Sequence, residues 1–263
     1  MPELPEVESI RRQLDPWLAG HQVLSSNSHA SAKFAPAEEI VGMTIESVKR
    51  RGKYLLFDLD DNREMVIHLG MTGQLIPVKD LSDPYLRAWW EIDDGTFLGF
   101  RDVRRFGRIR IAVNGVYEGT LAQLGPEPLS DAFTPEHLYA ACKRSTRKIK
   151  TQLLSQKPVA GVGNIYADEA CFRSGIYPGL RKITKDQARR LHDEIRNVLL
   201  VALGNGGTTL RDYVNAEGKK GQNQEFLLCY GRWNEPCLIC GTVLQRTVLD
   251  GRGTTYCRNC QSR

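Results

Sequence analysis

Cys237-Leu238-Ile239-Cys240, followed after sixteen residues by Cys257-Arg258-Asn259-Cys260, decides how the C-terminal part of this chain folds. Two Cys-x-x-Cys pairs at this spacing are typical of a zinc ribbon, in which each pair supplies two thiolates to one tetrahedral ion. A segment of fewer than about 40 residues cannot build a sufficient apolar core, so the metal replaces it. Two disulfides or four unrelated cysteines are the alternatives, and a reducing compartment disfavours both. The sequence therefore predicts one zinc ion with a structural role, because four thiolates leave no open position for a substrate.

The remaining composition bounds the class of protein. A chain of 263 residues suits one large domain or about two at roughly 150 residues each. A hydrophobic fraction of 41% and a charged fraction of 25% are ordinary for a globular protein, and no apolar run approaches the roughly 20 residues of a membrane span. The acidic N-terminus lacks the basic and then apolar pattern of a signal peptide. We therefore expect a cytoplasmic protein without membrane contacts.

Charge is distributed unevenly along the chain. Residues 1–130 hold 15 Lys and Arg against 19 Asp and Glu, a balance of −4, whereas residues 131–263 hold 21 against 12, a balance of +9. An excess of positive charge in one half indicates a polyanionic partner. The C-terminal half is expected to provide the main contact surface.

Hydrophobic periodicity divides the rest of the chain. Residues 1–125 are predicted to form a mainly β domain, a sandwich or barrel, opened by one helix over Val7–Leu18. Its strands are expected at Thr44–Val48, Tyr54–Leu59, Glu64–Leu69, Trp89–Ile92, Thr96–Phe100 and Arg108–Val113. After a Gly-Pro linker, residues 131–225 are predicted to be helical, with helices at Thr134–Lys143, Ile149–Leu154, Ile165–Ser174 and Lys185–Leu203. Residues 226–263 hold the ribbon, so the fold class is α+β with several domains.

The N-terminal segment Met1-Pro2-Glu3-Leu4-Pro5-Glu6-Val7-Glu8 is a candidate for covalent chemistry. Removal of Met1 would make Pro2 a free secondary amine, and a terminal amine titrates about two units below lysine. Such an amine can attack an electrophilic carbon to form an iminium adduct, and Glu3 could serve as general acid and base if burial raises its pKa. The competing interpretation is a stiff acidic terminus that frays in solvent.

Five further segments carry features suited to a nucleic acid. A glycine-rich turn places Arg252 where it could reach a phosphate, and a second such turn precedes Asn164 at a predicted helix start. Arg147 and Lys150 add positive charge for a DNA backbone just upstream. Residues 101–110 combine five arginines with Phe106, a pairing of cations and an apolar wedge that proteins use to enter a groove. Met71 lies on another glycine turn, where it could be a second wedge or a core residue.

Together these motifs resemble bacterial formamidopyrimidine-DNA glycosylase. The resemblance covers residues 2–262 in unbroken order and rests on six segments: Pro2–Glu8, Arg51-Gly52-Lys53-Tyr54, His68-Leu69-Gly70-Met71-Thr72-Gly73, Arg104-Arg105-Phe106-Gly107, Gly161-Val162-Gly163-Asn164-Ile165-Tyr166 and the ribbon. It implies an N-terminal β-sandwich, a helix-two-turns-helix DNA-binding domain and a C-terminal zinc finger. It also implies a monomeric enzyme of base excision repair, acting on damaged double-stranded DNA in the cytoplasm, at the nucleoid of a bacterium.

The resemblance assigns roles to single residues. Pro2 would attack C1′ of a nucleotide carrying 8-oxoguanine or a formamidopyrimidine, and Glu3 would shuttle protons. Lys53 would donate a proton in β-elimination, and Arg252 would act in δ-elimination. Residues expected to fill the space left by the extruded base, face the orphaned cytosine or bind phosphates are Met71, Arg104, Phe106, Arg147, Lys150 and Asn164. The segment Gly207–Phe226 would close over the lesion, whose base must leave the stack.

The sequence departs from the family pattern at one place and leaves other functions open. Family members commonly carry His-x-His where this chain reads Tyr85-Leu86-Arg87, so a phosphate contact is missing unless Arg87 supplies the charge. An endonuclease VIII-like glycosylase for oxidised pyrimidines is one alternative, which Leu4, Met71 and Phe106 disfavour. A non-catalytic DNA-binding module and a zinc-ribbon protein for RNA or protein are others. The presence of Pro2, Glu3, Lys53 and Arg252 disfavours both.

Overall fold

A computed structural model describes residues 1–210 and 213–261. The chain forms two compact units, one of Met1–Ala122 with Leu203–Gln224 and one of Gln123–Ala202 with Glu225–Arg263. Positions 211–212 belong to the predicted lesion segment Gly207–Phe226 and lie outside the described residues. Positions 262–263, in the predicted finger of residues 226–263, also lie outside them. The division into three domains by sequence pattern remains a prediction.

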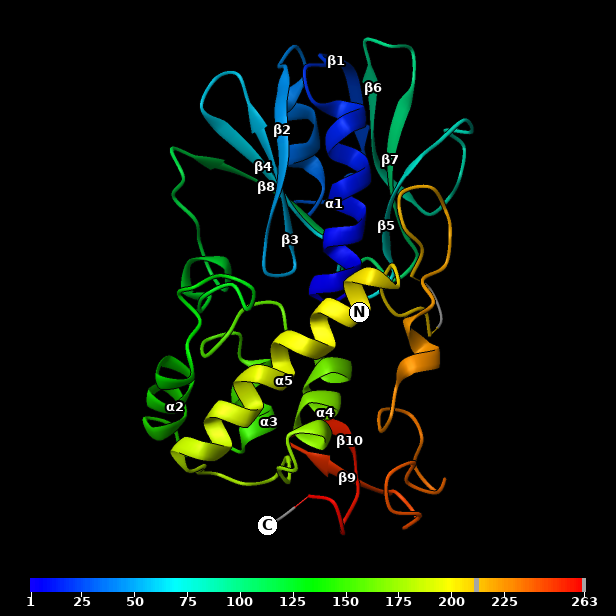
Figure 1. The fold of residues 1–263 in the computed structure, drawn as a ribbon. Coiled ribbons are helices and arrows are strands. Elements are labelled where there is room, and N and C mark those ends of the chain that lie inside the picture. Colours follow the sequence, from blue (N-terminus) through cyan, green and yellow to red (C-terminus); the bar gives the residue numbers. More distant parts are fainter. Residues whose placement is uncertain (211–212, 262–263) are drawn as a thin grey trace. The chain divides into compact units, whose positions relative to one another are not determined.

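The first unit is a sandwich of two antiparallel four-stranded sheets (Figure 1). One sheet has the order β1 (Val23–Ser28), β6 (Leu86–Ile92), β7 (Phe97–Asp102) and β5 (Gly73–Pro77). The other has the order β2 (Ile45–Arg51), β3 (Tyr54–Leu59), β4 (Arg63–His68) and β8 (Arg108–Val113). The sandwich and the α+β class are as predicted, whereas the polar strand β1 and the short strand β5 were missed. Neither has the dense apolar alternation on which a prediction from sequence relies.

One apolar core joins both sheets to helix α1 (Leu4–Leu18) and the 3₁₀ helix η1 (Ala35–Ile40). Five apolar residues of α1 recur at helical spacing and are buried: Leu4, Val7, Ile10, Leu14 and Leu18. The helix starts three residues earlier than its predicted start at Val7, because Glu3 and Glu6 form a capping box and Pro5 lies in the first turn, where its missing N–H costs nothing. The N-terminus is thus part of the folded sandwich.

The second unit contains the helices α2 (Pro135–Lys143), α3 (Ile149–Leu154), α4 (Asn164–Arg173) and most of α5 (Lys185–Gly204). It also contains the hairpin of β9 (Gln245–Leu249) and β10 (Arg252–Tyr256). Two further 3₁₀ turns are η2 (Leu121–Gln123) and η3 (Asn223–Phe226). The four helices agree with the predicted ranges to within one residue at each end. Among the described residues, no helix combines the length and the apolar character needed to cross a membrane.

Candidate functional site

The N-terminal residues are buried at the start of α1. Pro2 is buried, and Glu3 is only 2% exposed. Glu3 is the N-cap of α1, and its backbone N–H donates to Glu6 Oε2 at 2.7 Å. The interpretation of a fraying terminus is therefore wrong, because burial and the capping box hold this segment against the core. A carboxylate adjacent to the candidate amine is fixed rather than free to move.

Glu6 also holds the segment that follows α5. Its second oxygen, Oε1, accepts the Thr208 N–H at 2.7 Å, and the Tyr213 hydroxyl donates to the Glu6 carbonyl at 3.3 Å. Gly207 has φ +85°, and a Cβ there would lie 2.9 Å from Glu6 Oε1, so a side chain would disturb this contact. Reasoning from sequence gave Glu6 no role. The Glu3-x-x-Glu6 spacing of a capping box was the available signal.

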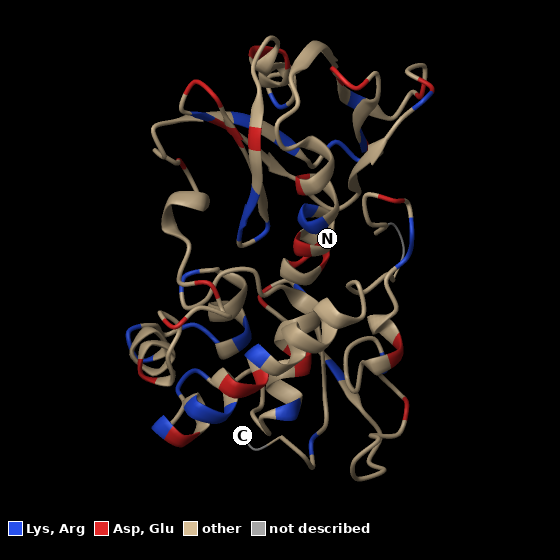
Figure 2. Cartoon of the chain, turned by 45° about the horizontal axis from the view of Figure 1, so that its top comes forward, with Lys and Arg blue, Asp and Glu red and all other residues tan. Residues whose placement is uncertain are grey.

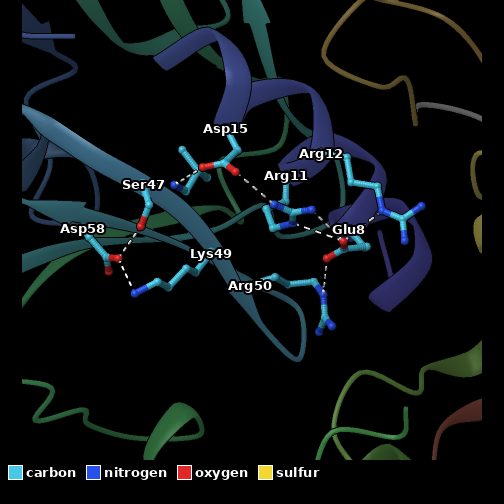
Figure 3. A network of polar contacts seen from close by, with 9 residues as sticks. Glu8, Arg11, Arg12, Asp15, Ser47, Lys49, Arg50 and Asp58 are labelled. Carbon is cyan, nitrogen blue, oxygen red and sulfur yellow. Dashed lines mark hydrogen bonds and ion pairs between the residues drawn. The ribbon is translucent and has the colours of Figure 1, made fainter. Parts of the chain in front are cut away.

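Glu8, on the same helix, contacts Arg50 in the hairpin of β2 and β3 (Figure 3). Lys53 lies between these two strands. Arg50 donates from Nε to Glu8 Oε2 at 3.0 Å and from Nη1 to the Gly52 carbonyl at 3.1 Å. Burial opposes ionisation of Glu8, but the hydrogen bond from Arg11 and the charge of Arg50 together keep the pKa of Glu8 below its ordinary value. Lys53 itself is 6% exposed. Figure 2 shows basic residues along this hairpin.

His68 lies at the end of β4, beside the same hairpin. Its Nδ1 accepts the Gly70 N–H at 3.2 Å, and its ring packs on Tyr54 with 4.8 Å between centroids. Burial, followed by the charges of Lys53 and Arg108, lowers the pKa of His68 to about 4. His68 is therefore neutral near pH 7, and Lys53 is close enough to influence it. The sequence motif contains His68 but predicted no role for it.

Three predicted DNA-contacting side chains lie on two adjacent turns of the first unit. Met71 is 41% exposed and Phe106 is 46% exposed, although both are apolar. The guanidinium carbon of Arg104 lies 4.7 Å from the centre of the Phe106 ring. Gly70 lets the turns approach closely, since a Cβ there would lie 2.5 Å from the Phe106 carbonyl carbon. Met71 is therefore an exposed tip and not the core residue that was the alternative.

In the second unit, Asn164 and Arg252 lie around one hairpin. Asn164 begins α4, and its Nδ2 donates to the Gly253 carbonyl at 3.3 Å. Arg252 is exposed at the start of β10, after Asp250 and Gly251 with φ of +48° and +79°. Asp250 is held by Lys148 at 3.1 Å. The arginine is thus presented on a tight turn whose base is anchored.

Lys150 does not fit the predicted phosphate contact. Its side chain is 1% exposed and forms an ion pair with Asp168 at 2.7 Å. Its ammonium also donates to the Gly253 carbonyl at 2.8 Å and to Thr254 Oγ1 at 3.0 Å. An ammonium has three donors, and these partners use them within the protein. Lys150 therefore joins α3 to the hairpin, while Arg147 remains exposed and able to reach a ligand.

The four predicted zinc ligands converge. The Sγ atoms of Cys237, Cys240, Cys257 and Cys260 all lie within 4.8 Å of one another. The Cys237–Cys260 and Cys240–Cys257 sulfur separations are 3.9 and 3.5 Å. Tetrahedral coordination at a Zn–S distance of about 2.3 Å places sulfurs roughly 3.8 Å apart, so the donor set fits zinc. With four thiolates around it, the ion would shape the finger and leave no open position for a reactant.

Three parts of the chain match known protein families. Residues 1–109 match the formamidopyrimidine-DNA glycosylase N-terminal domain, residues 124–214 its H2TH domain, and residues 234–263 the zinc finger found in FPG and IleRS. Formamidopyrimidine-DNA glycosylase of Bacillus licheniformis is 42% identical, and that of Bacillus subtilis 40%, each over the full length of both chains. The chain belongs to the formamidopyrimidine-DNA glycosylase family.

Solved structures of this glycosylase family share the fold. The MutM (Fpg) protein of Thermus thermophilus has a TM-score of 0.92 and 42% identity, covering 99% of this chain and 98% of that one. A Lactococcus lactis Fpg mutant in complex with Fapy-dG-containing DNA has a TM-score of 0.90 and 31% identity, with full coverage of both chains. MutM in complex with carbocyclic 8-oxo-G DNA also has a TM-score of 0.90, at 32% identity over both full chains. The predicted family and the zinc finger are thereby confirmed.

Arg87, at the departure from the glycosylase pattern, is buried. It is 3% exposed and donates from Nε to the Asp102 carbonyl at 2.7 Å and from Nη1 to the Pro84 carbonyl at 3.0 Å. Its charge does not face the solvent, so it does not replace a phosphate-contacting histidine. Reasoning from sequence also missed the buried acids Asp102, Asp168 and Glu169, which hold the exposed turns. A lone Asp or Glu within a motif gives no signal of burial.

Proposed function

We propose that this chain is a bifunctional DNA glycosylase and AP lyase that excises oxidised purines, 8-oxoguanine and formamidopyrimidines, and cleaves the strand by β,δ-elimination. One observation carries the proposal: Pro2 and Glu3 are buried together at the capped start of α1, in a chain of this family. A secondary amine held beside a carboxylate suits attack on a sugar carbon. The reaction requires that Met1 be removed, because Pro2 nitrogen is otherwise an amide.

The proposal assigns a residue to each step of the reaction. The Pro2 nitrogen lone pair would form a bond to C1′ while the glycosidic bond breaks and the base leaves with a proton. Ring opening gives an iminium, and Glu3 would carry protons to and from the sugar. Loss of a C2′ proton then expels the 3′ phosphate, with Lys53 as proton donor. Loss of a C4′ proton expels the 5′ phosphate, with Arg252 assisting.

Recognition of DNA would depend on side chains of both units. In the first unit, Met71 and Phe106 would enter the stack where the lesion has left it, and Arg104 would face the orphaned cytosine. In the second unit, Arg147 and Asn164 would bind backbone phosphates, with Asn164 at a helix N-terminus that favours anions. Zinc in the finger would stabilise the Arg252 turn and take no part in the chemistry.

The cellular setting follows from the proposed substrate. A monomer acting on damaged duplex DNA is expected in the cytoplasm at the nucleoid. The segment Gly207–Phe226 would close over the lesion. By this proposal, residues 1–125 are the catalytic domain, 131–225 the helix-two-turns-helix domain and 226–263 the zinc finger.

Borohydride trapping tests the proposed function. Reduction of the iminium on an abasic duplex should leave a covalent complex of protein and DNA. An N-terminal extension that is not cleaved should abolish trapping, while Glu136→Gln, at an exposed surface residue of α2, should retain it. Efficient trapping by a chain whose Met1 is shown by mass spectrometry to be retained would sink the assignment of Pro2.

A further inference from the structure

A buried aspartate connects the two exposed turns of the first unit. Asp102, at the end of β7, is 0% exposed, and each of its carboxylate oxygens serves a different turn. Oδ1 accepts the hydroxyl of Thr72, which follows Met71. Oδ2 accepts the Gly107 N–H at 2.7 Å, immediately after Phe106.

Thr72 closes the connection in the other direction. Its Oγ1 accepts the Arg104 N–H at 3.1 Å while its hydroxyl hydrogen is donated to Asp102. Thr72 is 7% exposed, so water competes little for the groups that form these two hydrogen bonds. A buried network whose members are all hydrogen bonded is rigid and costly to disrupt. The backbone before Arg104 is thus held by the turn that carries Met71.

Two more side chains hold the backbone of the Arg104–Phe106 turn and of Asp102 by hydrogen bonds. Arg87 donates to the Asp102 carbonyl at 2.7 Å, and Lys33 donates from Nζ to the Arg105 carbonyl at 3.0 Å. Arg105 has φ +56°, a left-handed conformation that a residue other than glycine adopts only when its surroundings hold it there. The turn between Arg104 and Phe106 is therefore fixed through its backbone, while these two side chains remain exposed.

We propose that Asp102 and Thr72 are positioning residues that make the Met71 turn and the Arg104–Phe106 turn one rigid element, and that this rigidity determines discrimination of the base opposite the lesion. The inference rests on the proposed function. A bidentate contact from Arg104 discriminates only when its direction is fixed, because a guanidinium on a mobile turn finds acceptors on either base.

Thr72→Val tests the connection with little change in shape. Valine removes the donor to Asp102 and the acceptor for Arg104, whereas Thr72→Ser keeps both and is the matched control. With 8-oxoguanine duplexes, Thr72→Val should reduce the ratio of excision rates opposite cytosine and adenine by about fivefold or more, the lower end of what a bidentate base contact provides. Thr72→Ser should retain the ratio. Asp102→Asn should act in the same direction, and Thr72→Val keeps the test valid if that variant does not fold.

A double-mutant cycle separates positioning from general damage. In the wild-type background, Met71→Ala and Phe106→Ala should be non-additive in their effect on the ratio, and in the Thr72→Val background they should become additive. Equal slowing opposite both bases, an unchanged ratio in Thr72→Val, or additivity in both backgrounds would each overturn the proposal. Borohydride trapping on a single-stranded abasic site should persist in Thr72→Val and Thr72→Ser. Its absence in the wild type would instead refute the glycosylase function.

Discussion

The exposed turns that carry Arg104 and Arg252 are supported in different ways. The Arg104 turn stands on a sandwich with a large apolar core and is held through one buried carboxylate, Asp102. The Arg252 turn stands on a small cluster of Phe172, Leu244 and cysteines. It relies on the buried pair of Lys150 and Asp168 and on the four-cysteine cluster. A functional turn needs a polar anchor in both cases, but a turn above a small core needs charge and metal as well.

Helix α4 shows how much of this support is acidic. Asp168 accepts the Thr255 N–H at 3.1 Å, and its neighbour Glu169 accepts the N–H groups of Leu228, Cys229 and Tyr230 at 3.0, 2.8 and 2.8 Å. Both carboxylates are 1–2% exposed. Helix α4 thus holds both β10 and the segment that leads to Cys237 and Cys240. In the sandwich, the apolar core holds the two sheets together, and the buried Asp102 holds the exposed turns.

Loss of the metal should have the largest effect of the changes considered, on the Arg252 turn and on DNA binding. Chelation, or Cys240→Ser, removes a site whose apparent binding free energy is about 10–16 kcal/mol in zinc-finger peptides, so the Arg252 turn should lose its order and DNA binding should fail. Metal analysis should give about one zinc per chain before treatment. Leu238→Ser is the control, because Leu238 lies between Cys237 and Cys240 and is 63% exposed. This variant should keep its metal. Full DNA binding by a metal-free preparation would contradict this.

Breaking the buried ion pair should have the next largest effect. Asp168→Asn leaves the Lys150 ammonium buried without its counter-charge, which typically costs about 3–5 kcal/mol. Urea unfolding measures this, and the ratio of δ- to β-elimination products should fall with it. The exposed pair of Asp186 and Arg189 gives a matched control, since Asp186→Asn should change stability by less than about 1 kcal/mol. Comparable losses from both variants would show that burial is not the cause.

The sandwich should show its own electrostatic sensitivity at acidic pH. Because the folded state lowers the pKa of His68 from 6.5 to about 4, the unfolded chain binds a proton more readily between these values. The contribution of His68 to the free energy of unfolding is therefore fully present above about pH 6.5. It is lost as the pH falls toward 4, and the loss is at most about 3 kcal/mol. NMR titration of the His68 ring checks the pKa. The slope of unfolding free energy against pH should be smaller in His68→Asn, and an identical slope would refute the assignment.

Removing the Arg104 side chain should have the smallest and most specific effect. Cytosine offers two acceptors, O2 and N3, whereas adenine presents a partly donor edge. Arg104→Ala should therefore reduce the preference for 8-oxoguanine opposite cytosine by about 1–3 kcal/mol while trapping on a single-stranded abasic site is kept. Arg105→Ala, which removes a neighbouring exposed guanidinium, is expected to leave the ratio intact. If Arg104→Ala leaves it intact too, discrimination lies elsewhere.

The family, a sandwich or barrel, the four helices and the zinc ligands could be predicted from the sequence alone. Each of these depends on local pattern: apolar periodicity for the elements, and the spacing of Cys237, Cys240, Cys257 and Cys260 for the metal. Helical and strand periods are short, so a few residues suffice to read them. The start of α1 was misplaced by three residues although its signal is also local, because the Glu3-x-x-Glu6 spacing of the capping box was not used in the prediction.

Which charged residues are exposed and which hold the fold depends on contacts that form only in the folded chain. Lys150 and Arg147 are three positions apart and equally cationic, yet one is enclosed by Asp168, Gly253 and Thr254 while the other is exposed. Arg87 and Arg104 differ in the same way. A side chain's charge is local information, but its burial depends on partners 15 to more than 100 residues away. Those distant contacts turn an apparent DNA ligand into a structural support.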